Sequence, residues 1–383
     1  MTRAVNPRVA ALIYGDGEQP ADSQLRAQLD SQVVAPVETL FIHSRPGDLA
    51  FASEVSSALS GLPRGITWIW LLDSSVELSR STLAELLQRA EVSPSAAIIG
   101  AKQLRQQDRS ILSSLGISIS QLAEPVRLRS GEFDQGQHDA DSDVLAADPN
   151  CSLVLRDTFE GEIGALATSP GQAFGYELGM RVRVAGRRVL VEPRALCWVV
   201  EPPDANKLAG QFAVLTARIH LAFLTLPLAL VLSYLVLAPL LIPLSIGSAL
   251  LRKLPAQAIA APAAIVWSWV TVANRLRARA SLRVLGGISG QRDFWLTRSE
   301  LRKLRMMNQS SEIVIAEART RLFESGVVWW LLVPVLASFQ LFAYGVAQSG
   351  ELAPLSGSLP ELLRTAFVTQ QPYSDGVFTT TDP

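Results

Sequence analysis

Short apolar runs alternate with helix-like segments along the first two hundred residues. The apolar runs are six to eight residues long and rich in β-branched and aromatic residues, which is typical of strands. They span residues 9–14, 37–43, 66–73, 96–101 and 152–157. Amphipathic segments such as TLAELLQRA, residues 82–90, lie between them. Strands that alternate with helices indicate an α/β domain with a mostly parallel sheet and helices on both faces.

The pattern changes after these strands, where long uncharged stretches begin. The 31 residues of Leu221–Leu251 carry no charge. As one straight helix of about 46 Å they exceed the hydrocarbon layer of a membrane, about 30 Å. Break points are available at Pro227, Pro239 and Pro243. Val327–Val346 is a second uncharged stretch with aromatic residues near both ends, and this predicts a transmembrane helix.

Charge predicts the orientation of these stretches. Between Arg252 and Arg321 there are 13 Lys or Arg residues against four acidic residues, whereas the segment after Gln348 is mainly acidic. The positive-inside tendency therefore places the basic tract in the cytoplasm and the tail outside. We expect the amino-terminal domain to be cytoplasmic too, because its first apolar run is too short for a signal peptide. The chain then crosses the membrane an even number of times in between.

Two arrangements satisfy this condition. In the first, which the weak hydrophobicity of residues 255–274 favours, residues 221–251 form a hairpin and residues 255–274 lie flat at the interface. In the second, each segment crosses the membrane once. A buried core helix over residues 221–251 is the remaining alternative.

Four regions follow from these patterns. We expect the α/β domain at 1–205, membrane hairpin or interfacial helices with a basic cytosolic segment at 206–325, a transmembrane helix at 326–348, and a polar extracytoplasmic tail at 349–383. The basic tract carries interleaved apolar residues, so we expect it to contact anionic membrane lipids. Nucleic acid is not an expected partner.

Cysteine and histidine contribute little chemistry. Cys151 and Cys197 lie in apolar runs, where buried free thiols are expected. None of the three histidines, His43, His138 and His220, pairs with a cysteine or another histidine at the spacing of a zinc site. The sequence therefore predicts no structural zinc.

Asp73 is a natural candidate for a role in ligand binding. It ends the run ITWIWLLD and precedes Ser74 and Ser75. Open α/β sheets bind their ligands beyond the carboxyl ends of the strands. We therefore expect the site of this domain near Asp73.

Several motifs give a more specific resemblance. They are LLDSS at 71–75, FDQGQHD at 133–139, SDVLA at 142–146 and AGRRVLVEPRA at 185–195. With the membrane stretches that follow, their order resembles family 2 glycosyltransferases over residues 7–201. The most similar members are large bacterial proteins whose cytosolic nucleotide-sugar domain precedes a membrane region.

This resemblance implies a GT-A fold and the partners of such an enzyme. The donor is a nucleotide-diphosphate sugar, the cofactor is a divalent metal, Mg²⁺ or Mn²⁺, and transfer is inverting. The acceptor is a lipid-linked or cell-envelope glycan, and other membrane subunits are further partners. The location is the bacterial inner membrane.

The family's acidic motifs are incomplete in this chain. His43 stands where a carboxylate for the nucleotide base is expected, with Asp48 five residues later. Ser74 and Ser75 stand where the family has its metal-binding acids. Asp73 lies one position before them, and it is equally well explained as a metal ligand or as a turn cap.

The general base is also displaced. Gly175 stands at its expected position, and Glu177 is the only nearby carboxylate. Glu177 is therefore the candidate catalytic base, with a solvated helix residue as the alternative. Together with Asp73 it makes up the candidate catalytic pair.

The remaining candidates are binding residues. For the nucleotide sugar they are Tyr14, Asp16, His43, Asp48 and Ser75. Asp16 is as well explained as part of a turn between Gly15 and Gly17. Asp134, His138 and Asp139 are candidates for a polar wall of the acceptor or diphosphate cleft, and a plain acidic loop is the alternative.

Two functional hypotheses follow. One is an active, membrane-associated glycosyltransferase of cell-envelope or lipid-linked glycan synthesis. The other is a catalytically inactive relative that acts as a scaffold or regulatory subunit in such an assembly, because fold alone does not imply activity. A structural membrane protein unrelated to sugar transfer is a third alternative.

Overall fold

The computed structural model describes residues 8–15, 19–140, 142–200, 208–251, 255–285, 293–297 and 299–302. The predicted transmembrane helix at 326–348, the tail at 349–383 and the candidate Asp16 lie outside these residues. What is predicted for them therefore stays a prediction.

The amino-terminal part of the chain is an α/β domain. Its strands are β1 (Arg8–Tyr14), β2 (Glu38–Ile42), β3 (Ile66–Asp73), β4 (Glu77–Leu78), β5 (Ala96–Arg105), β6 (Leu112–Ser114), β7 (Ile117–Ile119), β8 (Pro125–Arg127), β9 (Cys151–Leu155) and β10 (Arg188–Val199). Its helices are α1 (Gln19–Asp30), α2 (Phe51–Ser60), α3 (Thr82–Val92), α4 (Arg156–Leu166) and α5 (Phe174–Val184), with a 3₁₀ turn at Gly171–Ala173. The predicted apolar runs all form strands.

The main sheet has eight strands in the order β2-β1-β3-β9-β5-β10-β4, and β6 pairs with β5. The pairs β1–β2, β1–β3 and β5–β10 are parallel. β9 is antiparallel to both β3 and β5, between which it lies. The sheet is therefore mixed, which corrects the mostly parallel pairing that we expected: the strands β2, β1, β3, β5 and β10 share one direction, but β9 separates them into two groups.

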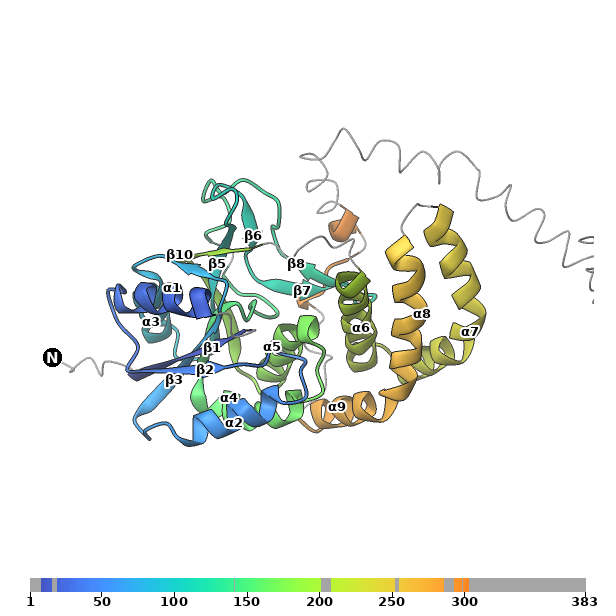
Figure 1. Cartoon of the computed structure of the whole chain (residues 1–383), viewed down its shortest axis with the longest axis horizontal. Helices are drawn as coiled ribbons and strands as arrows, with labels where there is room; N and C mark the ends of the chain where they lie inside the picture. Colours follow the sequence, from blue (N-terminus) through green and yellow to red (C-terminus); the bar gives the residue numbers. More distant parts are fainter. Residues whose placement is uncertain are drawn as a thin grey trace, which may run out of the picture. The chain divides into compact units, whose positions relative to one another are not determined.

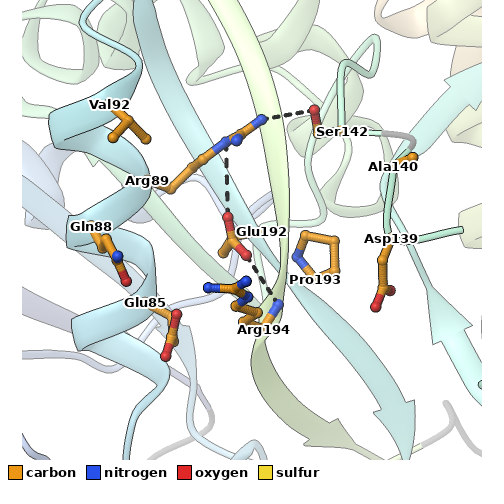
Figure 2. Close-up of a pocket in the computed structure, with 10 residues that line it drawn as sticks. All are labelled: Glu85, Gln88, Arg89, Val92, Asp139, Ala140, Ser142, Glu192, Pro193 and Arg194. Atoms are coloured by element: carbon orange, nitrogen blue, oxygen red, sulfur yellow. Dashed lines mark hydrogen bonds and ion pairs between the residues drawn. The ribbon is translucent and has the colours of Figure 1, made fainter. Parts of the chain in front are cut away.

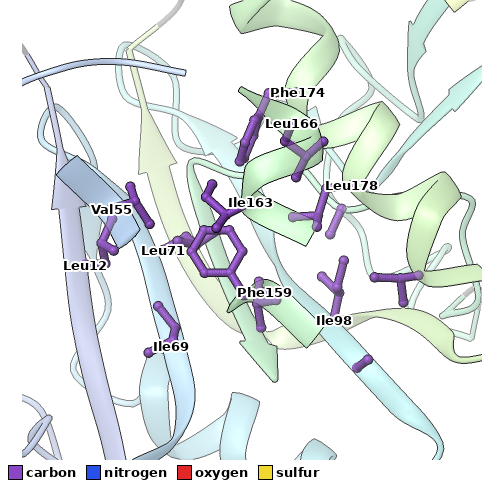
Figure 3. Close-up of a cluster of buried hydrophobic side chains, with 14 of the residues drawn as sticks. Leu12, Val55, Ile69, Leu71, Ile98, Phe159, Ile163, Leu166, Phe174 and Leu178 are labelled. Atoms are coloured by element: carbon purple, nitrogen blue, oxygen red, sulfur yellow. The ribbon is translucent and has the colours of Figure 1, made fainter. Parts of the chain in front are cut away.

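Alternating side chains of the strands build a core on each face of the sheet. In β1, Leu12 packs with α2, α4 and α5 on one face, whereas Ile13 packs with α1 and α3 on the other. Figure 3 shows the first of these clusters, in which Phe159 of α4 lies over Leu71 of β3. The helices on both faces were expected from the sequence, because a strand that is buried along its whole length, as β1 is, needs cover on each face of the sheet.

A helical region follows the sheet. It comprises α6 (Leu208–Thr225), α7 (Leu228–Leu251), α8 (Pro255–Val270) and α9 (Val272–Leu285), of which α7 and α8 pack side by side (Figure 1). The break near residue 226 falls at Pro227, but Pro239 and Pro243 lie within one helix, α7. An internal proline can kink a helix without ending it, so residues 221–251 comprise the end of α6 and the whole of α7. The membrane hairpin expected there stays a prediction.

The fit of these helices to a membrane is modest. Among the described residues, α6 is the one helix whose length and hydropathy suit a span, and α8 with α9 meets the same criterion only as a pair bent by 67°. α6 also packs on the α/β domain, because Ala217, Leu221 and Leu224 share a buried cluster with α5 and α9. A membrane position for this region stays a prediction.

Candidate functional site

Asp73 lies where the sequence places it, as the last residue of β3. Its carboxylate is nearly buried and both oxygens are occupied. Oδ1 accepts hydrogen bonds from the Ser75 backbone N–H at 2.9 Å and the Ser75 hydroxyl at 2.6 Å. Oδ2 is 3.1 Å from Nη1 of Arg45. Asp73 therefore has two structural roles: it stabilises the turn after β3 through Ser75, and it forms an ion pair with Arg45.

A second carboxylate, Asp148, lies at the same end of the sheet and was missed from the sequence. Its Oδ1 accepts the Asn150 N–H at 3.2 Å, and its Oδ2 is 3.4 Å from Nη2 of Arg127. Asn150 in turn accepts the Asp73 N–H at 3.0 Å. The Asp-Pro-Asn sequence directly before β9 could have indicated it. β9 runs antiparallel to β3 and β5, so the start of β9 lies at the end of the sheet where those strands end.

We name these two ion pairs, Asp73–Arg45 and Asp148–Arg127, the cleft pairs. Tyr14 at the end of β1 lies near them: burial raises the pKa of its hydroxyl, and the charges of Asp73 and Asp148 raise it further. Tyr14 is 3% exposed and stays a neutral phenol. In each cleft pair the carboxylate is largely buried, whereas the guanidinium side chain is 41% exposed for Arg45 and 37% for Arg127.

The other residues predicted to bind the nucleotide are placed less centrally. His43 and Asp48 are exposed beyond β2, and Asp48 accepts the Arg45 backbone N–H at 2.7 Å. Ser75 is exposed beside Asp73. Asp48 therefore shapes the turn that carries Arg45, and Arg45 itself is a site residue that sequence reasoning missed.

The residues present do not fit the divalent metal that the family implies. The described part of the chain contains no group of three or more His, Cys, Asp or Glu side chains arranged to hold a metal ion. Asp73 and Asp148 are each bound to an arginine, and a cation ligand set needs several unengaged oxygens. The predicted metal role of Asp73 has no support in this geometry.

Glu177 lies in a different environment from the cleft pairs. It is fully buried on α5, where Oε1 accepts hydrogen bonds from Arg181 at 2.8 and 3.0 Å and Oε2 is 2.7 Å from Nε2 of His220 on α6. We name Glu177, Arg181 and His220 the core network. Burial alone would raise the pKa of Glu177, but His220 and Arg181 outweigh it and lower the pKa.

This arrangement contradicts the predicted role of Glu177 as general base. A base must reach the acceptor hydroxyl within hydrogen-bond distance, whereas both oxygens of Glu177 are engaged and its side chain has no exposed surface. Its partner His220 lies 43 residues further along the chain, so no local pattern could have predicted the contact.

Gly175, at the position where the resemblance places the general base, is tightly packed. A Cβ atom at this position would lie 2.6 Å from Cδ of Pro149 and 3.2 Å from the carbonyl oxygen of Ala147. One turn later, a Cβ at Gly179 would meet Ala146 at 2.2 Å. α5 therefore packs directly on the segment before β9 through two glycines, and the position of the base has no room for a side chain.

The predicted cleft wall is held by a buried lysine. Lys102 of β5 is 3.0 Å from Asp134 and 2.8 Å from Asp139. Burial lowers the pKa of Lys102, but the hydrogen bonds to these carboxylates outweigh it and raise the pKa. His138 lies 2.7 Å from Glu132. These contacts favour a structural role for the segment.

A cavity of about 430 Å³ lies between α3 and β10 (Figure 2). Of the predicted wall residues, Asp139 lines it. Arg89 crosses it, with Nη2 donating to Ser142 at 2.8 Å and Nε 3.8 Å from Glu192. None of the residues of the cleft pairs contributes to this cavity. We locate the candidate site at the cleft pairs nonetheless, because ligands of open α/β sheets bind at the carboxyl ends of the strands.

The comparisons with known proteins bear on this domain. The family model for glycosyltransferase like family 2 matches residues 45–213. None of the curated proteins matches the chain. Among solved structures, the crystal structure of S. aureus TarS is similar at 9% identity and a TM-score of 0.35, over 57% of this chain and 40% of that chain. The chain thus spans less than half of TarS. With a TM-score this low, the likeness supports no inference about this chain.

The family match begins after β2 and extends into α6, so it includes Asp73, Asp148 and Glu177. It covers the motifs on which the resemblance was stated. Residues 45–213 are therefore a glycosyltransferase-like region of family 2, as the motifs predicted.

Proposed function

We propose that this protein binds a nucleotide-sugar donor at the cleft pairs, at a membrane, without transferring the sugar by the carboxylate-base route of the family. In this role it acts as a scaffold or regulatory subunit in the assembly of a cell-envelope or lipid-linked glycan. The observation that carries the proposal is Gly175: the family's base position has no side chain and no space for one.

The donor part of the proposal is supported by the family match and by the chemistry at the strand ends. Tyr14, Asp73 and Asp148 gather there with two partly exposed arginines. Guanidinium groups bind phosphate oxygens well, often through two hydrogen bonds. Loss of the base leaves this binding chemistry in place.

The membrane part is supported by exposed apolar side chains on the helical region. α7 exposes Leu230 and Val236, and α8 exposes Trp267 and Val270, each at between 48% and 77% of its surface. Apolar surface of this kind favours burial in lipid or against a partner. The proposed location is the bacterial inner membrane, with the α/β domain on the cytoplasmic side.

Activity assays on the full chain in lipid nanodiscs test the catalytic part. We expect no sugar transfer from radiolabelled UDP- or GDP-sugars to lipid extracts, while UDP or GDP binds in calorimetry. Transfer that disappears in Asp148→Asn would contradict the proposal.

An active transferase is the second candidate, and one observation favours it. Asp148 lies near Asp73 at the strand ends and is linked to it through Asn150, so a carboxylate released from its arginine would be available there. In that case Asp148→Asn abolishes transfer and leaves nucleotide binding nearly unchanged. The proposal above expects no transfer from either protein.

Cysteine labelling tests the topology. Cys151 and Cys197 are buried, so a Gln291→Cys variant reports mainly the new thiol. We expect it to stay unlabelled by a membrane-impermeant reagent in intact cells and to react after permeabilisation. Labelling from outside would reverse the proposed orientation.

A further inference from the structure

The cavity between α3 and β10 is built by three separate segments. Its lining residues on α3 recur at helical spacing along one stripe, residues 139–142 form the opposite side, and β10 lies between them (Figure 2). The β10 wall is irregular, because the register with β5 shifts between Glu192 and Leu196 and leaves residues 193–195 without a partner in β5. Bulges of this kind redirect side chains and are frequent beside functional sites.

The cavity is separate from the region where the family carries out transfer. Leu86 of α3 packs on one face of the main sheet, whereas Leu178 of α5 packs on the other. Gly175, at the position of the family's base, belongs to α5. A ligand in the cavity therefore lies on the opposite face of the sheet from the base position, and it leaves the cleft pairs free.

The charges around the cavity balance. The charged side chains among the described lining residues are Glu85, Arg89, Asp139, Glu192 and Arg194. The carboxylate of Asp139 is 2.8 Å from Nζ of Lys102, which offsets its charge. Two carboxylates and two guanidinium groups remain. Because ligand and site are matched in charge, a lining without net charge favours a neutral ligand over a phosphate or a polyamine.

Part of the lining is fixed and part is available for a ligand. Arg89 is held by Ser142, to which Nη2 donates at 2.8 Å, and Glu192 is held by the backbone N–H of Arg194 at 3.2 Å. In the part of the chain that the structure describes, the side chains of Glu85 and Arg194 form no hydrogen bond or ion pair. One offers acceptors and the other donors. Both kinds of group therefore face the same cavity.

Size and lining together define the ligand class. The volume of about 430 Å³ is that of a small-molecule site, about 300–1,000 Å³. Such sites are mostly apolar, whereas this lining is mainly polar and charged. A neutral ligand for it must both donate and accept hydrogen bonds at several neighbouring points. A hydroxyl group does both, and a sugar ring carries several adjacent hydroxyls.

We propose that this cavity binds a neutral saccharide unit of a glycan, with Glu85, Gln88 and Arg194 forming hydrogen bonds to its hydroxyl groups. The site holds glycan and does not transfer sugar. The inference goes beyond the donor proposed at the cleft pairs, because it assigns a second ligand to a different face of the sheet.

Saturation-transfer difference NMR on the full chain tests the proposal, in a detergent that carries no sugar. The neutral probes are cellobiose, maltose and N,N′-diacetylchitobiose, and the charged comparisons are inorganic phosphate and spermidine. We expect at least one disaccharide to bind more tightly than either charged probe. Its binding should weaken more than about fivefold in Glu85→Ala and in Arg194→Ala, and further in the double variant.

Matched controls lie on the same two elements. Glu91→Ala changes an exposed carboxylate of α3 outside the cavity, and Arg187→Ala changes an exposed arginine just before β10. Both should bind the disaccharide as the wild type does. Because Glu85 and Arg194 make no side-chain contact of their own among the described residues, all four variants should unfold at the same urea concentration.

Each outcome bears on the cavity alone. Disaccharide binding that is unchanged in Glu85→Ala and Arg194→Ala, or weakened equally in the controls, overturns the location. Tighter binding of phosphate or spermidine overturns the neutral ligand, and no binding of any disaccharide overturns the site. UDP and GDP binding is measured on the same proteins: its absence throughout contradicts the donor proposal and leaves the saccharide site standing.

Discussion

The cleft pairs and the core network use the same kinds of charge in opposite environments. In the cleft pairs the arginine side chains are about two-fifths exposed, whereas Arg181 in the core network is 1% exposed and Glu177 and His220 have no exposed surface. Ionic groups that reach solvent can exchange partners with a ligand. Ionic groups that are fully buried cannot do so without a large desolvation cost.

This difference assigns different roles to the two regions. The core network joins α5 of the α/β domain to α6, and Arg181 also reaches Ser281 on α9 at 2.9 Å. It therefore fixes the helical region onto the domain. The cleft pairs hold turns at the strand ends, where the arginine side chains are partly exposed.

The largest expected effect comes from the core network. Glu177→Gln removes the buried carboxylate that Arg181 and His220 share, and leaves Arg181 only Glu162, at 3.3 Å, as a counter-charge. We expect the free energy of unfolding to fall by about 3–5 kcal/mol. Urea unfolding of the full chain in detergent, followed by tryptophan fluorescence, measures it. A change as small as that of Arg64→Gln, at an exposed residue just before β3, would mean that water reaches the network.

Gly175→Ala gives the next largest effect. The new methyl group meets Pro149 and Ala147, and we expect a loss of about 1–3 kcal/mol. Gly161→Ala on α4 is the matched control, because nothing lies within 4 Å of its Cβ position; it should stabilise the helix by up to about 1 kcal/mol. Equal effects of the two variants in the same unfolding assay would contradict the close packing of α5.

Acid should weaken the core network. The pKa of Glu177 is held below its ordinary value of 4.5, so its contribution to stability is complete above that pH and is lost as the pH falls through the folded-state value. We expect the difference in melting temperature between the wild type and Glu177→Gln to shrink below pH 4.5. Thermal unfolding from pH 7 to pH 3 checks this, and parallel curves would contradict it.

The smallest effect on stability is expected at the cleft pairs. Arg45→Gln removes a partly exposed ion pair, and we expect a loss of up to about 1 kcal/mol. The same urea unfolding assay measures it. A stability loss as large as that of Glu177→Gln would remove the distinction between the two regions.

The sequence was sufficient for the strands and for the position of Asp73. Nearly continuous apolar runs such as those of β1 and β3 identify strands with two covered faces, and the end of such a strand is where open α/β sheets bind their ligands. The direction of β9 was not predictable, since a short buried strand has the same pattern in either direction. The mixed sheet and the place of Asp148 follow from that direction.

The partners of the charged residues were equally beyond the sequence. Arg45 and Arg127 come from turns and an edge strand, and His220 comes from a helix that was expected to belong to the membrane. Ion pairs between distant segments depend on how the chain packs, so the partners have no characteristic spacing along the sequence. For the same reason Glu177 could be identified as a lone carboxylate but not as a buried one.

The antiparallel course of β9 has a consequence for how such a domain can diversify. The segment from β8 to β9 delivers Asp148 and Asn150 to the ligand end of the sheet, and its last part, from Ser142 to Ala146, is hydrogen-bonded to β7 and β10. Residues 135–137, further ahead, are exposed, so insertions or deletions there can reshape this loop while the scaffold keeps its geometry. Natural variation in loop length there offers a route from one donor to another, or from transfer to binding alone.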